Sequence, residues 1–139
     1  MGIVYIAKYI LREEYQCGCC AGLPPSYTEP HDIAFETLFD SFALIRERWG
    51  RPLNISSGYR CPGWNSYVSG HPLSQHQFGL ALDLDVESEQ VETLHNIIEE
   101  VAPDLRVGKY PGFIHIDAGY FVYPKASHSW QKGYRWREI

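Results

Sequence analysis

The sequence predicts a small α+β domain with a mostly antiparallel sheet and helices packed on one side of it. Three observations support this fold. The chain has 139 residues, about the length of one domain, so residues 1–139 are expected to fold together. Hydrophobic residues make up 45% and aromatic residues 14% of the chain, enough for a packed core. The local patterns run helix, strand, long loop, strand, helix, strand, strand, which favours the α+β class.

Two segments have apolar residues at helical spacing. The first ends at Gly50, and Pro52 prevents its continuation. Its apolar face consists of Phe35, Leu38, Phe39, Phe42, Ile45 and Trp49. The second runs from about Glu89 to Val101, with Ser88 as the expected N-cap. Before the first helix, residues 17–30 are rich in Gly, Pro, Ser and Thr and are expected to form a loop.

Four short segments alternate between apolar and polar residues, as strands with one buried face do. They are residues 53–57, 80–86, 105–109 and 113–117. The last part of the chain, residues 120–139, is aromatic and basic and shows no such alternation. We expect it to be an irregular segment that wraps over the domain.

Charge and hydropathy exclude several classes of protein. The net charge is −5 and the pI about 5.6, which argues against a nucleic-acid-binding protein. The longest nearly apolar run, Gly2 to Leu11, is interrupted by Lys8 and is far shorter than the ~20 residues that span a bilayer. It also lacks the basic start and cleavage site of a secretory signal. We therefore expect a monomer made in the cytoplasm without membrane insertion.

The chain has four cysteines, and three of them lie close together: Cys17, Cys19 and Cys20, with Cys61 further along. Four cysteines allow three disulfide pairings, and the sequence does not choose among them. A metal site completed by Cys61 or a histidine is a further alternative, although structural zinc sites usually have two CxxC-type pairs. The spacing favours packed free thiols or a disulfide over a metal.

Two of the expected strands place carboxylates and a histidine on one face. The strand at residues 80–86 contributes Asp83 and Asp85, and the strand at residues 113–117 contributes His115 and Asp117. Burying such groups is costly unless they are paired or bind a metal. With His76 just upstream, a His, Asp, His set suits zinc and leaves the fourth position open, as catalytic zinc sites do. A His–Asp hydrogen bond within the sheet is the simpler alternative, and Asp85 is expected to be a strand-end residue.

Three blocks of sequence resemble one family. Ser74-x-His76-x-x-Gly79-x-Ala81-x-Asp83 is similar to the SxHxxGxAxD signature of the M15 zinc peptidases, the group of D-alanyl-D-alanine carboxypeptidases and peptidoglycan endopeptidases. The stretch Ile55-Ser56-Ser57-Gly58-Tyr59-Arg60-Cys61-Pro62 and the strand Gly112-Phe113-Ile114-His115-Ile116-Asp117 resemble two further blocks of one subgroup. The resemblance covers about residues 9–119 and implies the zinc fold shared with the hedgehog signalling domain.

The resemblance implies a role for each matching residue. It makes His76 and Asp83 ligands of one zinc ion, with the third ligand on the strand at residues 113–117. Ser74 is expected to orient a ligand, and Arg60 to face the substrate or oxyanion. Tyr59 and Gln75, which lie within these motifs, are expected near the ligands or substrate.

The last motif leaves two assignments open. Other branches of the family have a glutamate base three residues before the ligand, where this chain has Gly112. Either His115 binds zinc while Asp117 acts as the base or supports the ligand, or Asp117 binds zinc and His115 moves the proton. We favour His115 as the ligand, because imidazole is the stronger zinc donor. In the mechanism that follows, Asp117 accepts the proton of an activated water and passes it to the leaving amine.

The resemblance also implies the substrate. We expect cleavage of peptide bonds in bacterial peptidoglycan stem peptides or cross-links, at a bond involving D-alanine, by an enzyme of the bacterial wall or of phage lysis that acts at the wall after its release. A non-catalytic, zinc-stabilised binding module is the alternative, because the glutamate base is absent. The tail is favoured as a packed wrap over a cationic, aromatic wall-contacting patch formed by Lys125, Trp130, Lys132, Arg135, Trp136 and Arg137.

Overall fold

A five-stranded sheet forms the centre of the protein, for which the computed structural model describes residues 3–24, 31–122 and 128–137. The strand order is β3-β4-β6-β5-β7. Neighbouring strands are antiparallel except for β5 and β7, which are parallel. The predicted α+β class and mostly antiparallel sheet are confirmed. The strands are β3 (Ile55–Ser57), β4 (Ala81–Asp85), β5 (Arg106–Tyr110), β6 (Phe113–Asp117) and β7 (Arg135–Arg137).

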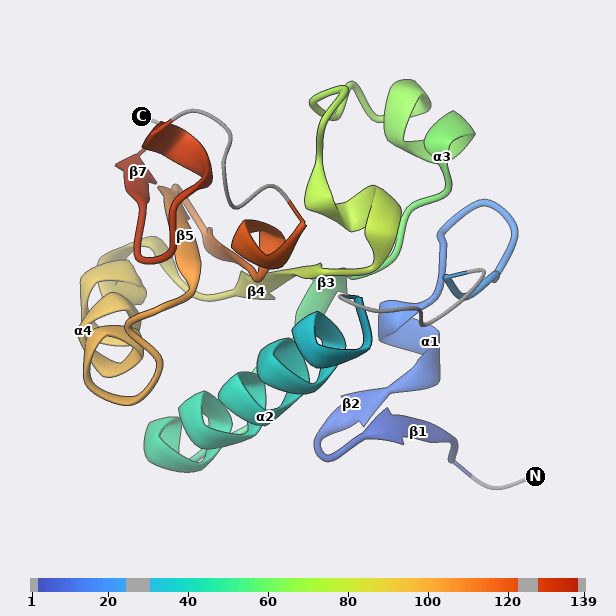
Figure 1. Cartoon of the computed structure of the whole chain (residues 1–139). Helices are drawn as coiled ribbons and strands as arrows, with labels where there is room; N and C mark the ends of the chain where they lie inside the picture. The colour runs from blue at the N-terminus through green and yellow to red at the C-terminus, as the bar shows by residue number, and fades with distance from the viewer. Residues whose placement is uncertain (1–2, 25–30, 123–127, 138–139) are drawn as a thin grey trace.

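Helices α2 (His31–Trp49) and α4 (Val91–Val101) cover one face of this sheet (Figure 1). Both were predicted, and α2 ends as expected, with Gly50 at a φ of +78° that favours glycine. The core between helices and sheet consists of fully buried side chains, among them Leu38, Phe42 and Ile45 of α2, Leu94 and Ile98 of α4, and Leu82, Leu84, Ile114 and Ile116 of the strands. Burial of each such side chain contributes roughly 1.5–3 kcal/mol to stability.

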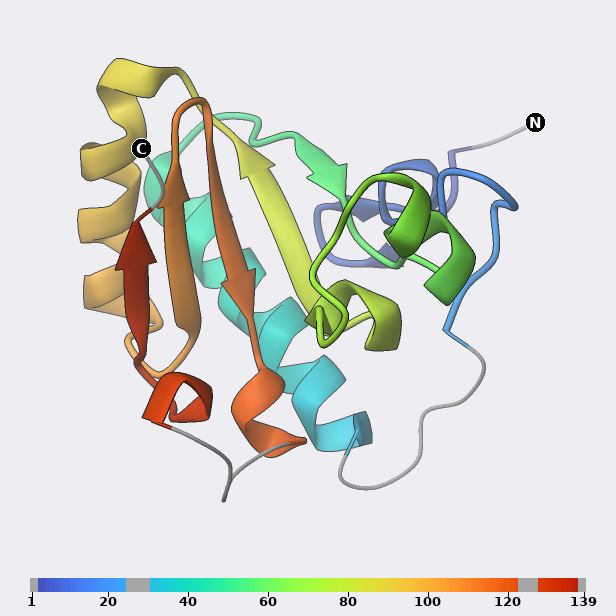
Figure 2. The same cartoon turned by 90° about the horizontal axis from the view of Figure 1, so that it is seen from above.

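The opposite face of the sheet carries shorter elements, seen from above in Figure 2. They are α3 (Pro62–Tyr67) and the 3₁₀ helices η1 (Gln75–Phe78) and η4 (His128–Trp130). The 3₁₀ helix η3 (Gly119–Phe121) follows β6 at the end of the strand and contacts α2. Because strand side chains alternate between faces, this face receives the polar residues of β4 and β6. The helices α2 and α4 therefore cover the apolar face of the sheet, and the polar side chains of β4 and β6 lie on the opposite face.

The N-terminal segment forms elements that the sequence did not predict. A hairpin of β1 (Tyr5–Ala7) and β2 (Ile10–Leu11) leads into α1 (Arg12–Tyr15). Tyr15 is fully buried and its hydroxyl donates a hydrogen bond to the Gly79 carbonyl at 2.7 Å. The Ser88 N-cap was wrong: Ser88 begins η2 (Ser88–Gln90), and Gln90 occupies the N-cap of α4.

The expectation of an irregular tail also needs correction. Residues 135–137 form β7, because Gly108 of β5 leaves the space in which the Trp136 indole packs. Arg135 and Arg137 form ion pairs with Glu99 and Glu92 of α4, which supports a packed tail. Lys125 lies outside the described residues. Within the described part of the chain, no helix has the length and apolar character needed to cross a membrane.

Candidate functional site

Strand register builds the site from two rows of residues across the polar face. In one row, Asp83 of β4 faces His115 of β6, which in turn faces Gly108 of β5. In the next row, Asp117 of β6 lies between Ala81 and Arg106. Each strand was predicted separately, but only their pairing places a histidine between two carboxylates.

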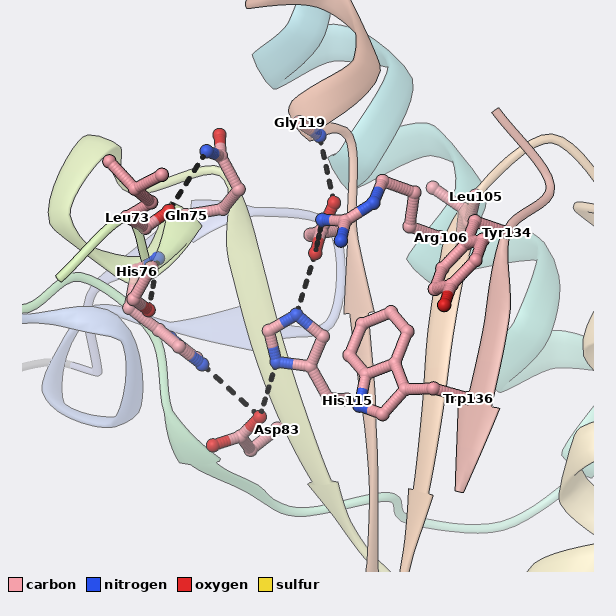
Figure 3. Close-up of polar contacts among 12 residues, drawn as sticks. Leu73, Gln75, His76, Asp83, Leu105, Arg106, His115, Gly119, Tyr134 and Trp136 are labelled. Carbon is pink, nitrogen blue, oxygen red and sulfur yellow. Dashed lines mark hydrogen bonds and ion pairs between the residues drawn. The ribbon is translucent and has the colours of Figure 1, made fainter. Parts of the chain in front are cut away.

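Three side chains that the sequence singled out converge at one point. Their ligand atoms lie within 4.8 Å of one another, and Figure 3 shows the side chains pointing toward each other. Asp83 Oδ1 lies 3.2 Å from His76 Nε2 and 3.0 Å from His115 Nδ1. Two imidazole nitrogens and one carboxylate oxygen form a donor set that suits a divalent transition metal.

The Gly58 carbonyl fixes the orientation of the His76 ring. Its Nδ1 donates a hydrogen bond to the Gly58 carbonyl at 2.6 Å, so Nε2 keeps its lone pair. That lone pair faces a carboxylate oxygen in a place where the ring is only 2% exposed. Two buried electron pairs face each other here, an arrangement that a bound cation stabilises. The chemistry of these groups therefore fits a metal ion.

His115 is held in the same way by Asp117. His115 Nε2 donates to Asp117 Oδ2 at 2.7 Å, which directs Nδ1 toward Asp83. Asp117 is 1% exposed, and it also accepts hydrogen bonds from Arg106 Nη1 at 2.7 Å and from the Gly119 backbone N–H at 2.9 Å. Asp117 therefore lies on the far side of His115 from Asp83, which is the geometry of a group that orients a ligand.

The titration of the three residues reflects their burial and mutual contacts. Burial lowers the pKa of His76, which favours the neutral ring that metals bind. Burial alone would raise the pKa of Asp83, but its electrostatic contacts with His76 and His115 hold it well below its usual range. For His115, burial is outweighed by its hydrogen bonds with Asp117 and Asp83, which raise its pKa to about 9.

Arg60 and Ser74 lie at the same site. Arg60 Nη2 contacts Asp83 Oδ2 at 3.3 Å, and Arg60 Nε donates to Ser57 Oγ at 3.0 Å. Arg60 therefore holds the carboxylate oxygen that does not face the histidines. Ser74 Oγ accepts a hydrogen bond from the His76 backbone N–H at 3.3 Å, so Ser74 positions His76 through the main chain of η1.

The two remaining predicted residues differ in position. Gln75 is buried beside the site, where its Nε2 donates to the Leu73 carbonyl at 3.4 Å and its side chain lies against Gly119. Tyr59 does not reach the cavity described next: its side chain is buried toward the cysteines, since it follows Gly58 and alternates away from Arg60. Its expected role near the ligands has no support in this geometry.

A cavity of about 590 Å³ opens over the ligands. Its wall also includes residues that were not predicted to lie beside the metal centre, which are Arg106, Tyr110, Phe113, Ser129, Trp130, Tyr134 and Trp136. Arg106 is 7% exposed and lies under the Trp130 ring, with its guanidinium carbon 4.1 Å from the ring centroid. A basic residue between the apolar Leu105 and Val107 was the available signal for it, because buried arginines require an acidic partner.

Most of the chain matches one protein family. A family model described as Peptidase M15 matches residues 12–117. The chain belongs to the peptidase M15 family. The match includes His76, Asp83 and His115 and ends at Asp117, so the tail that forms one cavity wall lies beyond it. No curated protein matches the chain. In this M15 family member, the matched segment carries the candidate metal-binding group, and the tail beyond it contributes to the cavity wall.

Proposed function

We propose that this M15 peptidase is a zinc-dependent enzyme that hydrolyses peptide bonds in bacterial peptidoglycan. The observation that carries the proposal is the convergence of His76 Nε2, Asp83 Oδ1 and His115 Nδ1 at the base of an open cavity. Three protein ligands with an accessible remaining position are characteristic of catalytic rather than structural zinc. His115 is the third ligand in this proposal, and one zinc ion binds at this centre.

A zinc ion held by these residues would act as a Lewis acid that polarises a peptide carbonyl and activates water. The protein contributes the orientation of the ligands. The Gly58 carbonyl and the Asp117 carboxylate each accept a hydrogen bond from one imidazole, so that the other ring nitrogen of each, the one that would bind zinc, faces Asp83. In this proposal Asp117 acts through His115 and holds its proton at Nε2. This differs from the expected role of Asp117 as proton acceptor from water.

Arg60 is the residue best placed to contact the substrate. Its guanidinium lines the cavity next to Asp83, and its side chain is 16% exposed. Its contacts with Ser57, Asn65 and Asp83 fix the plane of the guanidinium. A fixed guanidinium stabilises a peptide carboxylate or a developing oxyanion. This supports a substrate with a peptide carboxylate, such as a stem peptide ending in D-alanine, and the cross-link is the alternative target.

The setting of the activity follows from the substrate. Peptidoglycan lies outside the cytoplasmic membrane, so the enzyme acts at the cell wall after release, as a phage or prophage lysis enzyme does. We propose that it acts as a monomer, because the ligands and the cavity wall all come from one chain.

The test combines metal analysis with digestion of purified peptidoglycan. Zinc per chain is measured, and the same sample is incubated with peptidoglycan with and without a chelator while released products are identified by mass. Cleavage that the chelator abolishes and zinc restores supports the proposal, and product masses distinguish a carboxypeptidase from an endopeptidase. His76→Ala should abolish cleavage, whereas Glu13→Gln, an exposed change in α1, should not.

One observation favours a second candidate, a zinc-stabilised binding module without catalysis. Among the described residues that line the cavity, the carboxylates are Asp83 and Asp117, and both are held by basic partners. Position 112, where other branches have a glutamate, is a glycine with a φ of +86° in the tight turn between β5 and β6. Zinc-dependent binding to peptidoglycan without any released product would support this candidate.

A further inference from the structure

All four cysteines gather at one place outside the cavity. Cys17, Cys19 and Cys20 come from the loop after α1, and Cys61 comes from the N-cap of α3, more than 40 residues later. Their Sγ atoms lie within 4.8 Å of one another. No pair is bonded: the Sγ atoms of Cys17 and Cys19 are 3.6 Å apart and those of Cys19 and Cys61 are 3.4 Å apart. A disulfide requires about 2.05 Å.

These separations match a metal–thiolate site. Four sulfurs around a tetrahedral zinc ion, with Zn–S bonds of about 2.3 Å, lie about 3.8 Å from one another. We propose that Cys17, Cys19, Cys20 and Cys61 bind a second zinc ion in a closed, structural site. This proposal does not depend on the function proposed above, because it uses none of the same ligands.

The backbone around the cysteines is arranged to support such a site. The loop is closed by two hydrogen bonds, from the Cys17 N–H to the Gly22 carbonyl and from the Ala21 N–H to the Cys17 carbonyl, both 2.9 Å long. Two further N–H groups point at sulfur: Cys61 N lies 3.3 Å from Cys17 Sγ, and Trp64 N lies 3.4 Å from Cys61 Sγ. Backbone N–H donors directed at sulfur stabilise thiolates, the form that binds metal.

The loop also packs closely against α3. A Cβ at Gly18 would approach the Trp64 indole to 2.8 Å, so only glycine lets the loop lie on this ring. The packing holds Cys17 and Cys19 next to Cys61 in a folded chain. The two halves of the site are thus pre-positioned, which lowers the entropy cost of binding a metal.

A zinc ion here would also hold in place the segment that contacts His76 and Asp83. Cys61 directly follows Arg60, which contacts Asp83, and Gly58 three positions earlier accepts the hydrogen bond from His76. The cysteine cluster joins this segment to the N-terminal loop. We therefore assign the second metal the role of fixing residues 58–61 behind the candidate metal centre.

The test counts metals in protein purified under reducing, oxygen-free conditions with zinc present. The wild-type chain is expected to hold about two zinc ions, and His76→Ala/Asp83→Ala is expected to keep about one. Cobalt bound in place of zinc should show a thiolate-to-cobalt charge-transfer band in the near ultraviolet, and this band should persist in that double variant. Cys61→Ser should remove the band and one zinc ion, whereas the control Ser66→Ala, an exposed change in α3, should retain both.

Two results would overturn the proposal. The first is the absence of the cobalt–thiolate band in wild-type protein whose thiols remain reduced. The second is a mass spectrum of wild-type protein that shows disulfides among the four cysteines despite the reductant. Both readings come from wild-type protein, so they hold even if Cys61→Ser does not fold. If wild-type protein shows the cobalt–thiolate band but does not cleave peptidoglycan, only the function proposed above is refuted.

Discussion

His115 is the residue on which the candidate metal centre depends, because each of its ring nitrogens has a separate carboxylate. Nδ1 lies 3.0 Å from Asp83 Oδ1 and Nε2 lies 2.7 Å from Asp117 Oδ2. Arg106 neutralises Asp117 from the other side and is itself covered by Trp130. A buried carboxylate with a cationic partner stays ionised, and an ionised carboxylate keeps the proton of His115 at Nε2.

Asp117→Asn tests whether this carboxylate acts through His115. We expect a loss of zinc affinity of about 10–100-fold, because the amide orients the imidazole less well. Cleavage should recover substantially when zinc is saturating. Zinc affinity is measured by competition with a chromogenic chelator. The turnover number kcat for peptidoglycan cleavage is measured separately at saturating zinc. Asp85→Asn, at the exposed end of β4, is the matched control. Unchanged affinity with a large fall in kcat would make Asp117 the proton acceptor.

The pKa of about 9 for His115 predicts how zinc binding depends on pH. In the metal-free protein this ring is protonated at pH 7, so zinc must displace one proton from Nδ1. Affinity should therefore rise about tenfold per pH unit up to about pH 9 and then level off. Calorimetry in buffers of different ionisation enthalpy should detect release of about one proton at pH 7. An affinity that does not change between pH 7 and 8 contradicts the prediction.

At the scale of elements, the turn from η1 into β4 sets the distance between His76 and Asp83. Gly79 caps η1 with a φ of +75°, and its carbonyl accepts the hydrogen bond from the buried Tyr15. A Cβ at this position would lie 2.3 Å from the Tyr15 hydroxyl and 2.4 Å from Pro24. Glycine is therefore required here both by conformation and by space.

Gly79→Ala should destabilise the protein by about 2–6 kcal/mol. The positive φ contributes about 1–3 kcal/mol and overpacking about 1–3 kcal/mol. Gly63→Ala is the matched control, because a Cβ there meets nothing within 4 Å in the first turn of α3. Urea denaturation of both variants at saturating zinc gives the two free energies of unfolding. If Gly79→Ala and Gly63→Ala have equal free energies of unfolding, the turn at Gly79 tolerates a side chain.

At the scale of the whole molecule, the tail is part of the domain although it lies beyond the family match. β7 extends the sheet at β5, and Trp136 donates a hydrogen bond to the Tyr110 hydroxyl at 2.9 Å. The Trp130 ring covers Arg106, and the Ser129 carbonyl accepts a hydrogen bond from Arg106 Nε at 2.8 Å. The tail thus shields the Arg106–Asp117 pair that supports His115.

A chain that ends at residue 127 should therefore be less stable and less active. Loss of two half-buried tryptophans should cost at least about 3 kcal/mol, which lowers the melting temperature by about 10 °C. Circular dichroism gives the melting temperature, and the peptidoglycan assay gives activity. Lys132→Ala, an exposed change in the same tail, should leave both close to wild type. If the truncated chain has the wild-type melting temperature, the tail does not contribute to the stability of the domain.

The polar pattern of β4 and β6 allowed the candidate ligands to be predicted, whereas the groups that hold them in place were not predictable. Asp83 and His115 stand at alternate positions in apolar strands, a visible local signal. Gly58 acts through its carbonyl, which no side-chain pattern marks. Tyr59 was misplaced because its neighbours in sequence lie at the site while its own side chain is buried on the other side. β7 is only three residues long, too short for alternation to be recognised.

The sequence by itself determined the two long helices, four strands, the α+β class and the candidate ligands His76 and Asp83, with His115 or Asp117 as the third, since these follow from periodicity and from motifs within short segments. Tertiary structure alone decided the strand register, the place of Asp117 behind His115, the cavity wall from the tail and the meeting of Cys61 with the three earlier cysteines. Each of these depends on contacts between separate elements of the fold. Such contacts depend on the packing of whole elements, which local sequence patterns do not specify.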